Sequence, residues 1–397
     1  MKHTQANLPS IGFVSTYPPT ACGLATFTAA LRRAIAANRG SEQGLAVISV
    51  GGGRAMTPRP EVVYQHANGD SDSLRKTAAI LDRHDVAFLQ HEYGIYGRRD
   101  GAEVVDLMAD LETPTVVTLH TVLNNPTTGQ REILERIVDL ASSVVVMSDA
   151  GLRRLTGRYD VDAEKIQMIP HGAVASPAGP VPPRGARPLV LTWGLIGPGK
   201  GLETAIEAFS ALRDLRPLPR YVILGRTHPK VQAAHGDAYL EGLKAKSHAL
   251  GLEDVVEFDG RYLDTDSLVS AIRRADMVLL PYESAEQITS GVLVEAIAAG
   301  KPVVATDFPH AAEMLGTGAG ALVPHSDPDE MARALRRLLT EPGVSAQMAT
   351  VAASIGATLH WPVVAGQYES IASALHRSVG VTALPIRRGA DDLARVG

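Results

Sequence analysis

The chain has 397 residues, of which 45% are hydrophobic and 20% are charged, and its formal net charge at pH 7 is −5. This length predicts two or three domains, and the weakly acidic balance argues against non-specific nucleic-acid binding, which needs a concentrated basic face. The single cysteine, Cys22, excludes an internal disulfide framework and a cysteine-rich zinc site.

The hydropathy pattern is that of a soluble protein. No apolar run approaches the roughly 20 residues that a membrane-spanning helix needs. Residues 1–10 are polar and lack the apolar core of a secretion signal. We therefore expect a cytoplasmic enzyme without a transmembrane segment, and peripheral contact with a membrane surface stays open.

The first half of the chain alternates short runs rich in valine and isoleucine with helical periods. The expected strands are 11–15, 45–50, 62–65, 86–90, 115–119, 144–147 and 166–169. The expected helices are 24–37, 73–82, 101–111, 129–141 and 149–156. This alternation indicates parallel βαβ units.

A proline-rich segment, 175–188, interrupts this pattern and is typical of a linker. The alternation then restarts, with expected strands 189–192, 221–224, 255–258, 277–280, 302–306 and 321–323. The expected helices are 202–212, 239–250, 265–274, 291–300, 328–339, 344–356 and 361–376. We predict an α/β protein with two doubly wound domains facing across a cleft, residues 1–183 and 184–360, and a flexible tail from 378 to 397.

The loop 281–289 and the helix after it form the strongest candidate site in the second domain. In an open parallel sheet such a loop lies at the carboxyl ends of the strands, where ligands bind. A helix that begins at Ser290-Gly291 offers free backbone N–H groups and a partial positive charge, which suit a phosphate. Glu295, five residues after Ser290, can reach a ligand hydroxyl. The alternative is a surface βα unit with an ordinary N-cap.

Six histidines lie at the carboxyl ends of expected strands or within a few residues of them. They are His66, His91, His120, His171, His228 and His310. Facing sheets would gather them in one cleft, where imidazole suits hydrogen bonds to sugar hydroxyls, proton transfer or phosphate contact. Each could instead be a satisfied loop histidine. No H-x-x-x-H or H-E-x-x-H spacing occurs, so no metal site is expected.

A glycine-rich loop, 194–201, follows one strand and precedes a helix. It matches neither phosphate-binding fingerprint fully, yet Lys200 is well placed to meet a diphosphate; it could instead be a solvated lysine. Gly23 forms a second glycine turn in the first domain, where backbone could approach a ligand. The D-x-D segments that begin at Asp70 and Asp264 resemble metal clamps, but each is better explained as a helix cap.

Together these motifs resemble those of the retaining glycosyltransferases of family 4, and the resemblance covers nearly the whole chain. The family motifs are an N-terminal glycine loop, T-x-H, I-P-N-G, G-R-L-x-x-x-K-G, E-x7-E, A-M-A-x-G-x-P-V-V and a tryptophan that opens the last helix. The matching segments are STYPP at 15–19 with Gly23, VTLH at 117–120, IPHG at 169–172, Lys200-Gly201, 287–295, AIAAGKPVV at 296–304 and Trp361.

The resemblance implies two Rossmann-like domains of the GT-B fold, with a helix at 361–377 that crosses back to the first domain. It also implies transfer of a hexose from a nucleotide-diphosphate sugar to an acceptor hydroxyl, with retention, without a metal and without a further cofactor. The implied catalytic residues are His120, Lys200 and Gln287. The implied donor-binding residues are Gly23, Lys200, Arg226, His228, Arg261, Ser290, Gly291, Val292 and Glu295, and the implied acceptor-binding residues are His91, Glu92 and His171.

Two positions depart from the family pattern. Leu195 replaces the arginine of G-R-L, and Gln287 replaces the first glutamate of E-x7-E. Arg226 could replace the lost phosphate cation. A glycoside phosphorylase, a non-catalytic sugar-nucleotide binding subunit and a sugar-nucleotide epimerase remain as alternatives. The sequence identifies neither the donor sugar nor the acceptor.

Overall fold

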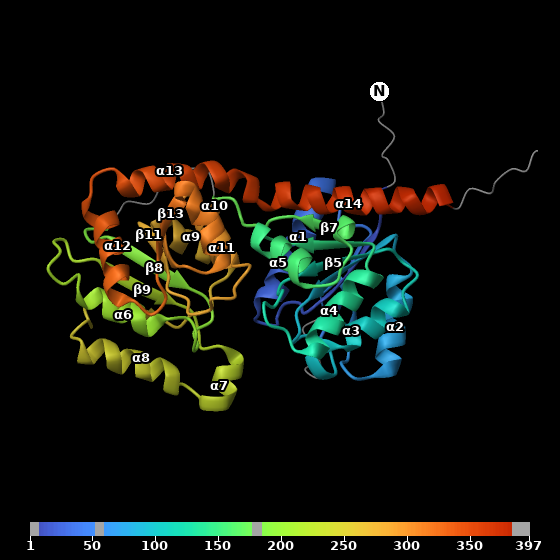
Figure 1. Cartoon of the computed structure of the whole chain (residues 1–397), viewed down its shortest axis with the longest axis horizontal. Coiled ribbons are helices and arrows are strands. Elements are labelled where there is room, and N and C mark those ends of the chain that lie inside the picture. The colour runs from blue at the N-terminus through green and yellow to red at the C-terminus, as the bar shows by residue number, and fades with distance from the viewer. Residues whose placement is uncertain (1–7, 52–58, 177–184, 383–397) are drawn as a thin grey trace, which may run out of the picture.

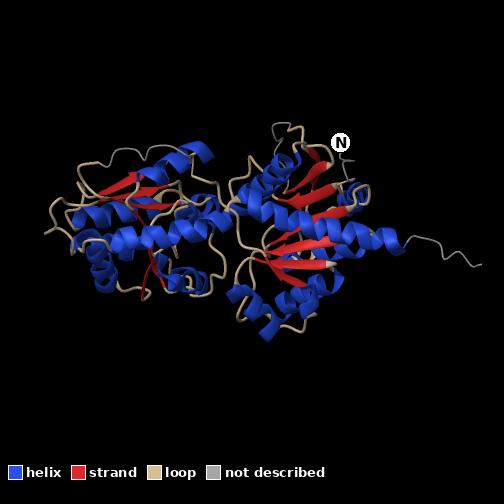
Figure 2. Ribbon diagram, turned by 90° about the horizontal axis from the view of Figure 1, so that it is seen from above, coloured by secondary structure: helices blue, strands red, loops and turns tan. Residues whose placement is uncertain are grey.

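The computed structural model describes residues 8–51, 59–176 and 185–382. The described chain forms two α/β lobes that lie side by side, and the last long helix runs from the second lobe along the first (Figure 1). Figure 2 shows that helices cover the sheets of both lobes. The predicted α/β class with two doubly wound domains is confirmed.

The first lobe contains a seven-stranded parallel sheet in the order β3-β2-β1-β4-β5-β6-β7. Its strands are β1 (Ile11–Ser15), β2 (Leu45–Val50), β3 (Val62–His66), β4 (Val86–His91), β5 (Thr115–Leu119), β6 (Ser143–Val146) and β7 (Ile166–Met168). Its helices are α1 (Gly23–Arg39), α2 (Ser71–Leu81), α3 (Glu103–Ala109), α4 (Thr128–Leu140) and α5 (Asp149–Arg158).

The second lobe repeats this topology with a six-stranded parallel sheet in the order β10-β9-β8-β11-β12-β13. Its strands are β8 (Leu189–Trp193), β9 (Arg220–Leu224), β10 (Val256–Asp259), β11 (Met277–Leu280), β12 (Val303–Thr306) and β13 (Gly320–Val323). Its helices are α6 (Leu202–Ser210), α7 (Pro229–His235), α8 (Ala238–Ala249), α9 (Thr265–Arg274), α10 (Gly291–Ala298), α11 (Pro309–Met314), α12 (Pro328–Thr340) and α13 (Val344–Gly356).

The strand order reverses beside the first strand of each sheet, between β1 and β4 and between β8 and β11. In doubly wound sheets this reversal leaves a crevice at the carboxyl ends of the strands, where ligands bind. Both expected glycine turns lie there, because α1 follows β1 and α6 follows β8. The topology therefore predicts one ligand-binding rim in each lobe.

The last helix, α14 (Trp361–Thr382), packs on the first lobe. Its buried side chains, among them Trp361, Val364 and Tyr368, belong to the same apolar cluster as Phe27 of α1 and Phe88 of β4. Arg39 at the end of α1 pairs with Glu369 at 2.7 Å. The helix thus completes the core of a lobe whose last strand, β7, ends at Met168, far before Trp361 in the sequence.

Several boundaries differ from expectation. Helix α14 continues to Thr382, whereas the sequence predicted its end near 376. The short helices α7 and α11 were not expected, because runs of 7 and 6 residues are too short to show a helical period. The division at 183/184 stays a prediction, since residues 177–184 of the expected linker, like most of the expected tail, lie outside the described residues.

Candidate active site

The N-terminus of α10 forms the first part of the candidate site, and its predicted start is confirmed. Ser290 is the N-cap, with its Oγ accepting from the N–H of Leu293 at 3.3 Å. The N–H of Ser290 itself donates to Nδ1 of His310 at 2.9 Å. Burial lowers the pKa of His310 to about 3, with a smaller contribution from His171. A neutral His310 therefore holds the peptide at which the helix begins.

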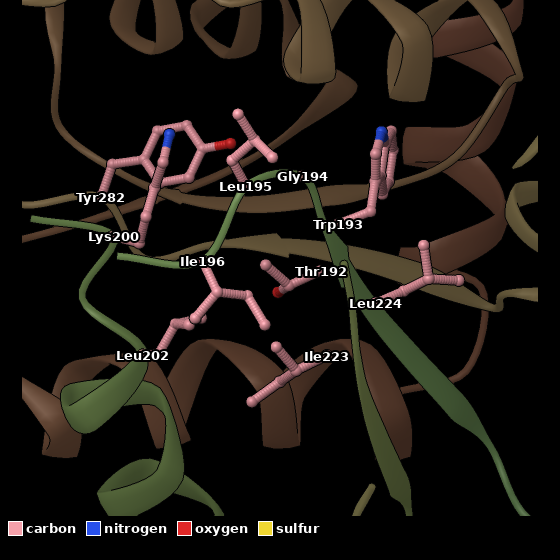
Figure 3. Close-up of a pocket in the computed structure, with 10 residues that line it drawn as sticks. All are labelled: Thr192, Trp193, Gly194, Leu195, Ile196, Lys200, Leu202, Ile223, Leu224 and Tyr282. Atoms are coloured by element: carbon pink, nitrogen blue, oxygen red, sulfur yellow. The ribbon is translucent and has the colours of Figure 1, made fainter. Parts of the chain in front are cut away.

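Lys200 lies beside this helix start, on the loop that follows β8. Its Nζ is 4.2 Å from the ring centre of Tyr282, and Figure 3 shows the two side chains together. Burial lowers the pKa of Lys200. Tyr282 in turn interacts with the side chain of Ser290 and with Glu295. One buried tyrosine thus connects the lysine with the beginning of α10.

Backbone geometry explains the glycine that follows Lys200. Gly201 has a φ of +62°, and a Cβ there would lie 1.7 Å from the carbonyl oxygen of Pro281. Only glycine tolerates both the left-handed conformation and this approach. A hydrogen bond of 3.0 Å from the N–H of Glu283 to Gly199 further joins the lysine loop to the loop after β11.

Glu295 lies on the second turn of α10, where its carboxylate meets the end of β8. The indole Nε1 of Trp193 donates to Oε2 of Glu295 at 2.9 Å. Burial raises the pKa of Glu295 to about 7, and the hydrogen bond from Trp193 opposes this rise. The Glu295 side chain, at the edge of the second sheet, therefore gains and loses its proton near neutral pH.

A small cavity opens beside these groups and contains the predicted residue Lys200. It is lined by Thr192, Trp193, Gly194, Leu195, Ile196, Lys200, Leu202, Ile223, Leu224 and Tyr282 (Figure 3). Val292, at the start of α10, would be in ordinary contact with a Cβ on Gly194, at 4.0 Å. The glycine loop and the lysine thus line one space in the second lobe, and the start of α10 lies next to the glycine loop.

The first lobe contributes a cluster of neutral side chains at the ends of β4 and β5. His120 Nε2 lies 2.7 Å from Oε1 of Gln90. Because that oxygen can only accept, Nε2 carries the proton, and Nδ1 is left as an acceptor. Burial lowers the pKa of His120 to about 3 and that of His91 to about 4. Both ring nitrogens of His91 and Nε2 of Gln90 are buried without a hydrogen-bond partner among the described residues.

The two lobes meet at His171. Its Nδ1 donates to the carbonyl of Gly172 at 2.7 Å, so Nε2 is the free acceptor. That nitrogen faces Gly291 of the second lobe, where a Cβ would lie 3.0 Å away. On its other side the ring of Phe27 lies 5.0 Å from His171 and 4.9 Å from His120, centre to centre. His120, His171 and the start of α10 are therefore brought together, and Tyr282 connects them with Lys200.

Direct contacts between the lobes hold the loop 283–289, which contains Gln287. The side chain of Ile288 inserts into the first-lobe core, and its carbonyl accepts from Oγ of Ser148 at 2.6 Å. Arg154 pairs with Glu286 at 3.2 Å. Glu313 of α11 accepts from the N–H groups of Asp149 and Ala150 at 3.1 and 3.0 Å. The loop before α10 is thus fixed by residues of both lobes.

The remaining first-lobe and loop residues have specific partners. Glu92 accepts from Oγ1 of Thr121 at 2.5 Å and from the N–H of Tyr93 at 3.0 Å. Gln287 donates to the carbonyl of Thr289 at 2.9 Å, so its carboxamide bonds within its own loop. Gly23 is exposed at the first position of α1, with open space where a Cβ would lie.

Three predicted donor-site residues lie further out on the second lobe. Arg226 is exposed, with its guanidinium 5.0 Å from the ring centre of Tyr262. Arg261 is also exposed and forms a two-armed pair with Asp259, with distances from 2.5 to 3.2 Å. His228 caps α7 through Nδ1, which accepts from the N–H of Lys230 at 3.1 Å. None of these three lines the cavity beside Lys200.

His66 does not join the other histidines. Its ring turns into the first lobe, with Nδ1 3.0 Å from Oγ1 of Thr77 and Nε2 3.5 Å from Glu103. Asp70 and Asp264 cap α2 and α9, which confirms the helix-cap interpretation of the D-x-D segments.

Within the described residues, no group of three or more His, Cys, Asp or Glu side chains gathers as metal ligands would. In the same residues, no helix is long and apolar enough to cross a membrane.

Sequence reasoning missed Gln90, Trp193 and Tyr282. Each follows or ends an expected strand, which is the position that pointed to the histidines. We considered only titratable residues and glycines at those ends, although a buried amide, indole or phenol there also needs a hydrogen-bond partner.

These features define a GT-B enzyme whose second lobe places a lysine and a helix start at the carboxyl ends of its strands. Residues 180–354 match the family model described as "Glycosyl transferases group 1". The D-inositol 3-phosphate glycosyltransferase of Corynebacterium jeikeium is 30% identical over 304 residues, which are 68% of this chain and 70% of that protein. The chain belongs to the group 1 glycosyl transferases.

Other relatives are more distant or match over a shorter length. The D-inositol 3-phosphate glycosyltransferase of Kineococcus radiotolerans is 28% identical over 57% of this chain and 56% of its own length. The phosphatidyl-myo-inositol mannosyltransferase of Mycolicibacterium smegmatis is 29% identical over 66% of this chain and 67% of its own length.

Solved structures share the fold at low identity. Anabaena HepE in complex with UDP aligns with a TM-score of 0.72 at 19% identity, covering 92% of this chain and 100% of that one. Sucrose-phosphate synthase from Thermosynechococcus elongatus aligns with a TM-score of 0.70 at 18% identity, covering 94% of this chain and 99% of that one.

Proposed function

We propose that the protein transfers a hexose from a nucleotide-diphosphate sugar to an acceptor hydroxyl, with retention at the anomeric carbon and without a metal ion. The observation that carries this proposal is a series of contacts across the lobes: Lys200 lies on Tyr282, Tyr282 interacts with Ser290 at the start of α10, and that start faces His171 of the first lobe. A UDP-hexose is the first donor to test, because HepE has been crystallised with UDP-glucose.

The second lobe supplies the groups that stabilise the leaving diphosphate. The N–H groups of Gly291 and Val292 are at the positive end of the helix dipole, and Lys200 adds a full charge. Charge grows on the diphosphate as the glycosidic bond breaks, so these groups bind the transition state more tightly than the donor. Their own positive charge supplies the stabilisation that a metal ion gives in other transferases.

The first lobe supplies neutral acceptors for hydroxyl groups. Nδ1 of His120 and Nε2 of His171 both carry a lone pair, and burial keeps both rings uncharged at pH 7. Such nitrogens accept hydrogen bonds from sugar hydroxyls of the donor or the acceptor. His91, the last residue of β4, and Glu92, which follows it, complete the acceptor side.

The names of two relatives suggest two classes of acceptor, a small inositol phosphate and an inositol lipid. The relatives' names specify a D-inositol 3-phosphate glycosyltransferase and a phosphatidyl-myo-inositol mannosyltransferase. Both names refer to a compound with an inositol ring. We therefore propose free inositol, inositol phosphate and phosphatidylinositol as the first acceptors to test.

The testing experiment has two stages. Nucleotide sugars are first screened for protection against heating, since a ligand that binds only the native state raises the melting temperature. The best donor is then incubated with the acceptors in EDTA, and the anomeric configuration of the product is read by NMR. Inversion would overturn retention, and loss of turnover in EDTA would overturn metal independence. Cleavage of a glycoside by inorganic phosphate, without nucleotide protection, would favour the phosphorylase alternative.

A further inference from the structure

Trp193 is a buried indole that ends β8 at the rim of the second sheet and lines the cavity that contains Lys200. Its side chain is only 6% exposed. Its Nε1–H donates to Oε2 of Glu295 at 2.9 Å, which joins β8 to α10 across 102 positions of sequence. No family motif that the sequence displays includes this residue.

Glu295 accepts fewer hydrogen bonds than a carboxylate requires. Its two oxygens together offer about four lone-pair sites. Among the described residues, Trp193 donates to Oε2, and no hydrogen bond to Oε1 is seen. Glu295 is partly exposed, so its second oxygen can accept a hydrogen bond from a ligand hydroxyl. A vicinal diol beside the diphosphate-binding lysine matches this need, because it offers two donors to one carboxylate.

We propose that Trp193 is a positioning residue for the donor nucleotide, whose indole N–H fixes the Glu295 carboxylate so that its free oxygen binds the ribose diol. This inference rests on the proposed function, which supplies the nucleotide. Tryptophan suits the task because its single N–H can only donate, so it occupies one carboxylate oxygen and leaves the other for the ligand.

The test removes the ribose 2′-hydroxyl from the ligand and the indole N–H from the protein, separately and together. Dissociation constants of UDP and 2′-deoxy-UDP are measured for the wild type, for Trp193→Phe and for Tyr221→Phe. Phenylalanine keeps an apolar ring and removes the N–H. Tyr221 is the matched control, because its hydroxyl hydrogen-bonds to Thr192 at 3.0 Å within the lobe interior and it does not line the cavity.

The wild type and Tyr221→Phe are expected to bind UDP about 10- to 100-fold more tightly than 2′-deoxy-UDP, as hydrogen bonds to a charged group imply. In Trp193→Phe this ratio is expected to fall to within about threefold of one, because the carboxylate is no longer aligned with the diol. An equal loss of affinity for both nucleotides would overturn the inference, since it would show a structural role only.

NMR gives a second measurement that needs no variant at position 193. The chain has two tryptophans, so a ¹⁵N spectrum contains two indole signals, and Trp361→Phe assigns them. The Trp193 signal is expected to titrate with Glu295 near pH 7 and to move more with UDP than with 2′-deoxy-UDP. Equal movement with both nucleotides would overturn the inference.

Failure of this inference is distinguishable from failure of the proposed function. If UDP, GDP and ADP all fail to bind, the proposed function falls, and this inference falls with it. If sugar transfer proceeds while the wild type binds UDP and 2′-deoxy-UDP equally, the function stands and the inference is wrong.

Discussion

A single carboxamide decides which nitrogen of His120 is free to meet a substrate. The Gln90 oxygen lies 2.7 Å from Nε2, which leaves Nδ1 as the acceptor. The sequence placed His120 at a strand end but not its partner, because β4 and β5 are adjacent only in the folded sheet. The tautomer of His120 depends on its contact with Gln90, and the local sequence around either residue does not reveal that contact.

Gln90→Glu is expected to charge His120. A carboxylate at this distance raises the imidazole pKa, because it favours the protonated form. Nδ1 then becomes a donor at pH 7, and we expect kcat to fall about 10- to 100-fold. Activity should recover as the pH rises through the new pKa. The measurement is a pH profile of kcat, with Gln347→Glu, at an exposed position of α13, as the control. A profile identical to that of the wild type would contradict the tautomer assignment.

Lys200→Ala removes the cation beside the start of α10. Loss of a group that stabilises developing charge typically costs about two to three orders of magnitude in rate. We expect kcat to fall by this factor, with a smaller change in donor affinity. Steady-state kinetics with the best donor test this, and Lys244→Ala, which breaks an exposed pair with Glu241, is the control. Near-normal turnover would remove Lys200 from the mechanism.

His91 is expected to make the fold sensitive to acid. Its folded pKa of about 4 is depressed below the unfolded value of 6.5, so the unfolded chain binds a proton first. Stability is therefore full above about pH 6.5 and decreases as the pH falls towards 4, by about 3 kcal/mol for this residue. Urea unfolding of wild type and His91→Gln at pH 7 and pH 5 measures this. The loss between the two pH values should be smaller in the variant, and an equal loss would contradict the expectation.

At the scale of elements, the strands were the most predictable part of the fold. Strands 86–90 and 277–280 contain apolar runs of four residues, as buried parallel strands do, and both were placed within one residue. The short helices α7 and α11 were missed because 7 and 6 residues are too few to show a helical period. The loop 283–289 could not be placed from sequence, because its anchor, Ile288, packs in the other lobe.

The loop that carries Lys200 requires glycine at position 201 for two reasons. The backbone is left-handed there, and a Cβ would clash with the carbonyl oxygen of Pro281. Gly40 has nearly the same φ, +64° against +62°, but open space where a Cβ would lie. Gly40→Ala therefore measures the left-handed penalty alone, about 1–2 kcal/mol. Gly201→Ala is expected to cost more in thermal unfolding and to lower kcat, because the new methyl group would displace the loop from Pro281. Equal costs for the two variants would contradict this account.

At the scale of the whole molecule, the contacts of Glu313 with the start of α5 join the lobes. A carboxylate at a helix N-terminus typically contributes about 0.3–1 kcal/mol, and up to about 2 when partly buried. Glu313→Ala is expected to loosen the two lobes, which should raise the radius of gyration of the nucleotide-free protein in solution scattering. Glu330→Ala, which breaks an exposed pair on α12, should leave it unchanged. An unchanged radius in both variants would show that the other contacts suffice.

The docking of α14 on the first lobe has a consequence for the order in which the protein is made. Tyr368 lies beside Phe88, with ring centres 5.8 Å apart, and its hydroxyl is 3.2 Å from Oγ1 of Thr118. A ribosome synthesises Thr118 250 residues before Tyr368. Throughout that interval the apolar face that α14 will share with α1 is only partly covered. The lobe that begins to fold first is therefore the last to be finished, and it must be protected from aggregation while its neighbour is translated.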